Sequence, residues 1–183
     1  MRYRFAVAAL ILLAMAGTAG AASNLALMGG AMFPVGDFGD ATDISPYGGA
    51  RIEFQDVNAR GQTAVISYLA WGGFGLLLAD GDYKKVLEAA GEDTDGTYFD
   101  LGIGGRVYTR SKLFVGAGVS YVNISQPGPG SGLNGIGFLV ELGLCFNQES
   151  FKFEIEGRGN AAFLEESADA QNIQVLAAIG FPF

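Results

Sequence analysis

Apolar and polar residues alternate along most of this chain with a period of two. The clearest stretch is FKFEIEGRGNAAF (residues 151–163), in which Phe, Ile, Gly and Ala fall on one parity and Lys, Glu, Arg and Asn on the other. Successive side chains of a β-strand point to opposite faces, so this stretch predicts a strand with one apolar and one charged face. Which of the two faces is buried depends on the rest of the chain.

Turn signals divide the chain into eight such segments, at about 24–34, 46–56, 62–78, 97–109, 112–124, 135–147, 150–163 and 172–183. Short connections (NAR with GQ, RSK, QE) alternate with longer ones (VGDFGDATDIS, ADGDYKKVLEAAGEDTDG, QPGPGSGLN, LEESADA). This alternation is typical of transmembrane barrels with short periplasmic turns and longer outer loops. We therefore predict an all-β fold, an eight-stranded antiparallel up-and-down transmembrane β-barrel.

Two segments add detail to this prediction. Glycines at 72, 73 and 75 are candidates for a β-bulge in the third strand, whose two parities are both rather apolar. KVLEAAG (residues 85–91) has helical composition and is expected to form a short helix or a flexible tip within the longest outer loop.

The first residues combine two arginines with a short apolar run. Arg2 and Arg4 precede residues 5–15, and Ala19-Gly20-Ala21 fits an A-x-A cleavage site. This order is typical of a secretory signal peptide. The alternative is a membrane anchor, but the run is short for a span of about 20 residues. We expect a cleavable signal peptide over 1–21 and a single barrel domain over 22–183.

Composition excludes several function classes. The formal charge is −8, and about −10 once Arg2 and Arg4 leave with the signal, which argues against a nucleic-acid partner. The chain has no histidine and a single cysteine, Cys145, so a His-dependent hydrolase, a zinc site and an intramolecular disulfide are all disfavoured. We predict no enzymatic activity and no cofactor, and a buried, unreactive thiol at Cys145.

Residues 172–183 alternate in the same way and end on Phe183, with Phe181 on the same parity. With the signal peptide and eight strands, the chain resembles the small outer-membrane β-barrels of the OmpA/OmpX type, in which a terminal Phe is the usual assembly signal. AMFPVGDFGD and KLFVGAGVSYVNI look like a first loop and a mid-barrel strand of that family. The resemblance covers essentially the whole mature chain.

That resemblance implies insertion into the cell outer membrane of a Gram-negative-type bacterium. Outer-membrane lipid and, during biogenesis, the barrel assembly machinery are the implied partners. Phe181 and Phe183 are the implied assembly signal. Members of the family have structural, adhesive, defensive or narrow-pore roles, so the fold leaves the function open.

In a membrane barrel the charged parity faces the lumen. That set contains four basic and five acidic residues: Arg51, Glu53, Asp100, Arg106, Glu141, Lys152, Glu154, Glu156 and Arg158. Buried charges must pair, and the interior of an eight-stranded barrel is just wide enough for side chains to fill. We therefore expect a salt-bridge network that closes the lumen, with Gly116, Gly118 and Ser120 leaving space for it.

Two alternatives concern this lumen. A narrow channel for small or hydrophobic solutes would need a continuous path between the charges. Glu154 and Glu156 could also form a glycosidase-type carboxylate pair, which we consider much weaker than membership of the network.

The outer loops are acidic, and they predict a structural or surface-interaction role. Their acidic residues are Asp37, Asp40, Asp43, Asp80, Asp82, Glu88, Glu92, Asp93, Asp95, Glu165, Glu166 and Asp169, with Lys84 and Lys85 among them. A surface ligand or a divalent cation is the candidate partner, and simple solvation of exposed loops is the alternative. A soluble lipocalin-like binder, with the Phe row inward, is a third hypothesis for the whole protein.

Overall fold

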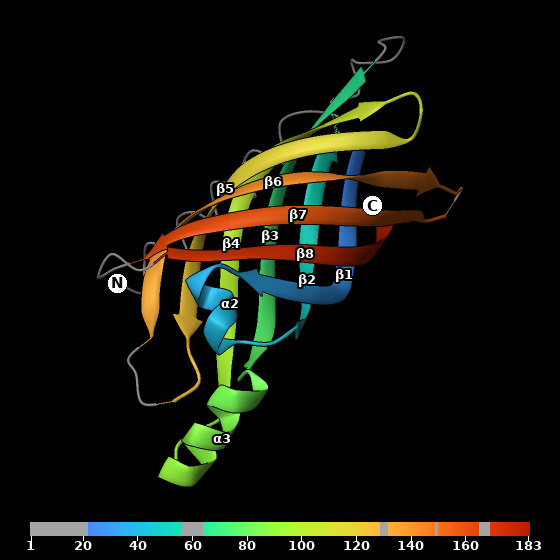
Figure 1. Cartoon of the computed structure of the whole chain (residues 1–183). Coiled ribbons are helices and arrows are strands. Elements are labelled where there is room, and N and C mark those ends of the chain that lie inside the picture. The colour runs from blue at the N-terminus through green and yellow to red at the C-terminus, as the bar shows by residue number, and fades with distance from the viewer. Residues whose placement is uncertain (1–21, 56–63, 129–131, 149, 165–168) are drawn as a thin grey trace.

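A computed structural model describes residues 22–55, 64–128, 132–148, 150–164 and 169–183. Eight strands follow one another around a closed barrel, with every neighbouring pair antiparallel and β8 paired to β1 (Figure 1). They are β1 (Ala22–Val35), β2 (Ser45–Gln55), β3 (Ala64–Leu78), β4 (Asp95–Thr109), β5 (Leu113–Ser125), β6 (Leu133–Asn147), β7 (Lys152–Leu164) and β8 (Asp169–Pro182). The predicted eight-stranded antiparallel up-and-down barrel is confirmed.

The strands are staggered around the barrel. The row of paired residues that starts at Leu25 passes through Ile52, Ala70, Ile103, Val119, Phe138, Ala161 and Gln171, and returns to β1 at Val35. The offset from Leu25 to Val35 is ten residues (35 − 25). Such a stagger requires the strands to tilt against the barrel axis. Residues that meet across the interior therefore often belong to strands that share no hydrogen bonds.

The outer surface of the barrel is apolar. Leu27, Val140, Leu142 and Ile155 are exposed, whereas the alternate residues of the same strands are buried. Within the described strands, charged residues occupy outward positions only at Asp95 and Asp169, the first residues of β4 and β8. This arrangement is the reverse of a soluble barrel and matches the lipid-facing band of a transmembrane one.

Aromatic side chains mark the two edges of this outer band. Near the short-turn ends of the strands, half-buried or exposed aromatic residues are Phe54, Tyr68, Phe146, Phe153 and Phe181. Toward the long-loop ends they are Phe33, Phe74, Phe99, Tyr121, Phe138 and Phe163. Two aromatic girdles around an apolar band are typical of barrels that span a membrane.

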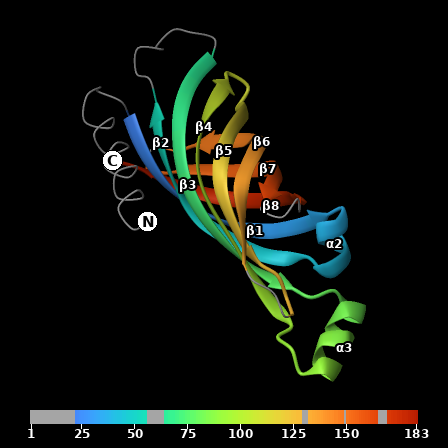
Figure 2. The same ribbon diagram turned by 90° about the vertical axis from the view of Figure 1, so that its left-hand side faces the viewer.

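Two helices lie at the long-loop end of the barrel. They are α2 (Asp37–Ala41), between β1 and β2, and α3 (Gly81–Ala90), between β3 and β4. Figure 2 shows both helices at one end and the C-terminus at the other. The helix expected within residues 85–91 is confirmed as the second half of α3. Among the described residues, no helix is long and apolar enough to cross a membrane.

Three details of the sequence prediction are wrong. Asp95, expected in the second outer loop, is the first residue of β4. The glycines of β3 cause no bulge, because β3 pairs residue by residue with β2 and β4 through that segment. The last strand begins at Asp169 and not at 172, and it pairs with Phe163 there, so Asp169 lies in β8 and not in the fourth loop. The predicted signal peptide (1–21), the first short turn and both Glu165 and Glu166 lie outside the described residues.

Candidate functional site

The interior of the barrel is layered along its axis, and β7 shows the order. From the short-turn end to the long-loop end, its buried inward residues are first charged (Lys152, Glu154, Glu156, Arg158), then polar (Asn160), then apolar (Ala162, Leu164). We name the three layers the charge network, the polar belt and the apolar layer. Because β7 is antiparallel to its neighbours, those strands traverse the same layers in the opposite order.

Two arginines form the centre of the charge network. Arg106 of β4 contacts both oxygens of Glu141, with Nη2 2.9 Å from Oε2, and also contacts Glu154 and Glu156 of β7. Arg51 of β2 contacts Glu154 and places its Nη1 2.9 Å from Oε2 of Glu156. Glu154 and Glu156 are therefore each contacted by both arginines, which come from strands separated by β3 alone.

The remaining two cations extend the network toward both ends. Near the short turns, Lys152 Nζ lies 2.6 Å from Glu53 Oε2 and 2.7 Å from Glu154 Oε1. On the other side, Arg158 Nη2 lies 2.9 Å from Glu156 Oε1, and its Nε is 3.3 Å from Glu141 Oε2. Four basic and four acidic side chains are thus joined without interruption.

Aromatic rings and a glycine fit the network into the narrow interior. The Arg106 guanidinium lies 4.2 Å from the Phe114 ring centroid, and Lys152 Nζ lies 4.3 Å from that of Tyr108, both within cation–π range. A Cβ at Gly116 would come within 2.5 Å of Glu141 Oε1 and 2.9 Å of Arg106 Cγ. Only a glycine leaves room there for the central ion pair.

Asp100 is the exception among the nine predicted charges. It is fully buried, but its carboxylate accepts hydrogen bonds from two neutral donors, Tyr47 Oη at 2.7 Å and Trp71 Nε1 at 3.0 Å. No ion pair of Asp100 occurs in the described part of the chain. The expectation that every buried charge would meet an opposite charge is therefore wrong at this position.

Asp100 belongs instead to the polar belt. The buried members of this belt are Tyr47, Tyr98, Asp100, Ser120, Asn160, Asn172 and Gln174. Asn160 Nδ2 donates to Tyr98 Oη at 2.7 Å, and Gln174 Nε2 donates to Asn172 Oδ1 at 3.2 Å. The sequence analysis named Asp100 and Ser120 as inward and placed Asn160 on the polar parity of β7 without making it a site residue. It missed Tyr47, Tyr98, Asn172 and Gln174, although the inward parity of β8 contained the signal for the last two.

The chemical alternatives considered for single residues gain no support from the geometry. Glu154 and Glu156 are both engaged by arginines, so neither is a free acid or base of a glycosidase pair. Cys145 is buried, and its Sγ lies 3.2 Å from Asn147 Oδ1. Across the described ranges, no three His, Cys, Asp or Glu side chains converge as a metal site.

Some of the described acidic loop residues stabilise local structure. Asp80 caps the start of α3 by accepting from Asp82 N at 3.1 Å. On the same helix, Asp82 pairs with Lys85 at 2.8 Å, and both side chains are largely exposed. Asp43 accepts from the backbone N of Ile44 at 2.6 Å. These contacts explain some of the acidic residues without requiring a bound cation.

Comparison with known proteins bears on the fold. No protein-family model and no curated protein matches the sequence. Among solved structures, the chain is similar to Neisserial surface protein A (NspA), with 12% identity, 90% of this chain and 98% of that chain covered, and a TM-score of 0.54.

Two further solved structures are similar at lower scores. The N-terminal β-barrel domain of Pseudomonas aeruginosa OprF has 13% identity, covers 89% of this chain and 99% of that chain, and has a TM-score of 0.46. Ail of Yersinia pestis, in complex with a heparin analogue, has 10% identity, coverages of 89% and 97%, and a TM-score of 0.45. With the closed antiparallel barrel described above, the likeness to NspA shows that this chain has the fold of the small eight-stranded outer-membrane β-barrels.

Proposed function

We propose that this protein is a non-enzymatic barrel of the bacterial outer membrane, closed to ions by its charge network and active at the cell surface through its acidic loops. The proposal of a closed lumen is supported by the uninterrupted set of ion pairs among four basic and four acidic side chains. These side chains lie in the half of the interior nearer the short turns. The eight charges of this network sum to zero.

The outer surface supports the membrane location. An apolar band with aromatic edges is costly in water and favourable in hydrocarbon. The termini of the described chain lie at the short-turn end, as expected for a barrel whose long loops face outward. A lipocalin-like soluble binder would require the Phe row of β7 to face inward, whereas Phe163 and Ile155 are exposed.

A surface role is supported by α3, at the long-loop end, and by the acidic residues that follow it. α3 projects away from the barrel (Figure 1), and it is fixed to its neighbouring loop by the buried Leu87 and by a hydrogen bond from Tyr83 Oη to Pro127 O at 3.4 Å. Beyond the C-terminus of the helix, the connection to β4 carries Glu92 and Asp93, and β4 begins with Asp95. Negative charge there opposes the helix dipole, so these residues do not serve helix stability.

Planar-bilayer recording tests the closed lumen. We expect the folded protein, inserted at single-molecule density, to give no reproducible conductance steps. Heat-modifiable migration on a gel and protease protection in vesicles verify that the inserted protein is folded. Reproducible unitary steps from such preparations would contradict the closed network.

Steps of that kind would support the second candidate function, a narrow channel. One observation favours this candidate: several buried polar atoms of the interior, among them Arg51 Nε and Glu53 Oε1, have no protein hydrogen-bond partner in the described residues. Water bound to such atoms is the natural start of a polar path. Solute-swelling assays with proteoliposomes would then identify the size and polarity of the permeant molecules.

A further inference from the structure

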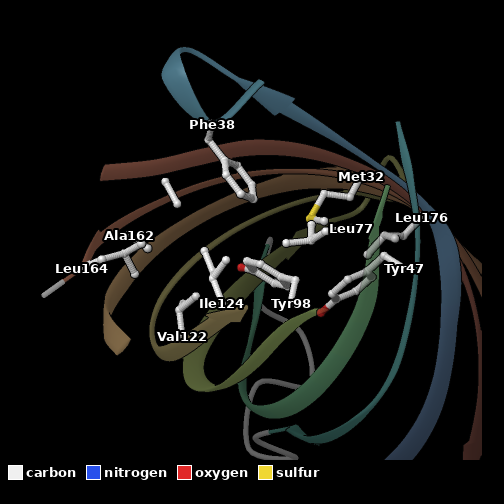
Figure 3. Packing of buried hydrophobic residues seen from close by; sticks show 11 residues of the cluster. Met32, Phe38, Tyr47, Leu77, Tyr98, Val122, Ile124, Ala162, Leu164 and Leu176 are labelled. Carbon is white, nitrogen blue, oxygen red and sulfur yellow. The ribbon is translucent and has the colours of Figure 1, made fainter. Parts of the chain in front are cut away.

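The interior at the long-loop end is apolar, unlike the charged half below it. The buried side chains that pack together there are Met32, Phe38, Tyr47, Leu77, Tyr98, Val122, Ile124, Ala162, Leu164, Ala170 and Leu176. Figure 3 shows Phe38 pointing from the α2 segment into the interior, toward the side chains contributed by the strands. Phe38 is the member of this cluster that does not lie on a strand. The lumen of a transmembrane barrel is ordinarily polar, so barrel formation alone does not call for this layer.

The segment that carries Phe38 is a helix of five residues, followed by Thr42, which forms a β-bridge with Ala79. α2 lies against β1 and β8, and Phe38 itself is almost fully buried. Its last turn is fixed by the Thr42 hydroxyl, which donates to Phe38 O at 2.5 Å, and by a hydrogen bond from Asp80 N to Ala41 O at 3.1 Å. At its start, Gly36 has a φ of 63°, which favours glycine and ends β1 abruptly.

Beneath the apolar layer, the polar belt contains buried atoms that lack protein partners. Ser120 Oγ, Asn160 Oδ1 and Gln174 Oε1 have no hydrogen-bond partner among the described residues, and neither has Arg158 Nη1 on the side of the charge network. An unsatisfied buried polar atom destabilises the folded protein. Water both donates and accepts, so it is the ligand that satisfies all four atoms.

A glycine leaves space for such water. A Cβ at Gly137 would lie 2.6 Å from Ser120 Oγ and 3.0 Å from Asn160 Oδ1. The two unpartnered oxygens, Ser120 Oγ and Asn160 Oδ1, therefore both face the position that a side chain at residue 137 would occupy. The polar belt is enclosed by the charge network on one side and by the apolar layer on the other.

We propose that α2 is an apolar lid: Phe38 closes the long-loop mouth of the barrel over a hydrated polar belt, and outward movement of α2 opens this mouth. An apolar constriction excludes ions by dewetting, whatever the state of the charges below it. The lumen then has two independent barriers, one of ion pairs and one of apolar side chains. This inference depends neither on the direction in which the barrel is inserted nor on a surface partner.

The single tryptophan of the chain reports on this lid. Trp71 is buried and donates to Asp100 of the polar belt, so its fluorescence measures access of a small neutral quencher to the interior. The Phe38→Asp substitution places a charge in the apolar layer and should force α2 outward. We expect it to raise the acrylamide quenching constant of Trp71 by about twofold or more in detergent-solubilised protein. Phe38→Ala should raise the constant less.

Ile44→Asp is the matched control, because Ile44 belongs to the same connection but is 54% exposed. In this variant the acrylamide quenching constant of Trp71 should equal that of the wild type. Heat-modifiable migration and circular dichroism verify that each variant is folded, and Phe38→Ala alone decides if Phe38→Asp does not fold. The lid is refuted if folded Phe38 variants quench like the wild type, if Ile44→Asp raises quenching equally, or if Trp71 is already freely quenched in the wild type.

Discussion

Glu156 has three cationic partners, and each comes from a different strand. Its carboxylate contacts Arg51 of β2, Arg106 of β4 and Arg158 of β7. No other acidic residue of the described network contacts three arginines. Without this charge, three buried guanidinium groups would share the remaining carboxylates. A buried cation without compensation is among the costliest defects in a protein interior.

We therefore expect Glu156→Gln to destabilise the barrel by about 3–5 kcal/mol, as measured by urea unfolding in lipid vesicles. Charge reversal by Glu156→Lys should lower the free energy of unfolding further. Glu88→Gln is the control, because Glu88 forms an exposed pair with Lys84 at 4.0 Å on α3. That pair is worth a few tenths of a kcal/mol at most. Equal losses in the two variants would show that the network contributes no more than a surface pair.

Asp100 should respond differently to the same kind of change. Its partners are the neutral donors of Tyr47 and Trp71, so Asp100→Asn leaves no cation unpaired. The amide oxygen can still accept from Trp71, and the Tyr47 hydroxyl can accept from the amide nitrogen. We expect a loss of about 1 kcal/mol or less in the same unfolding experiment. A loss as large as that of Glu156→Gln would mean that Asp100 also compensates the network.

At the scale of the element, β7 has the two faces that the sequence pattern predicted. Its charged row is buried, and Ile155 on the other row is exposed. Neighbouring residues of one strand therefore experience opposite environments. A charge that is required on one face is excluded from the other.

Ile155→Lys should oppose membrane insertion. A lysine on the lipid face costs about 2–4 kcal/mol at the bilayer midplane and less toward the interfaces. Gln171→Lys is the matched control, because Gln171 is exposed near the long-loop end of β8. The measurement is the fraction of protein that becomes heat-modifiable on folding into vesicles. Equal folding of both variants would contradict a lipid-facing position for Ile155.

At the scale of the whole molecule, the barrel must reach its membrane before any lumen or loop can act. Phe183 is 75% exposed and lies just beyond β8, so it adds little to the packing of the folded barrel. The resemblance to small outer-membrane barrels predicts a role in assembly for this residue and for Phe181. At Phe183, an effect on assembly in the cell can therefore be measured separately from an effect on the stability of the folded barrel.

We expect deletion of Phe183 to lower the amount of folded protein in the outer membrane of living cells. The unfolding free energy of the purified, refolded protein should change little, because few contacts are lost. Phe163→Ala is the control, because Phe163 is an exposed aromatic residue at the opposite end of the barrel. Normal insertion of the truncated protein would contradict the proposed assembly signal.

The sequence predicted what depends on local pattern. The period of two assigned Lys152, Glu154, Glu156 and also Asn160 to one face, and the structure buries all four side chains. The bulge in β3 and the start of β8 were wrong, because glycine composition and loop-like residues do not exclude a continuous ladder. Asp100 was misjudged because parity says that a charge is buried without saying which donors it meets.

The sequence by itself therefore determined the number of strands and the two faces of each, because side-chain direction in a strand repeats every two residues. The outward direction of the apolar face was predicted from other features, namely the alternation of loop lengths and the resemblance to outer-membrane barrels. The tertiary structure alone decided which side chains meet. Closure with a ten-residue stagger brings Arg106 of β4 to Glu154 of β7, which share no hydrogen-bonded ladder. It also places Phe38, from a helix between strands, over the interior. These contacts cross the barrel, and their partners depend on tilt and stagger, which no single strand encodes.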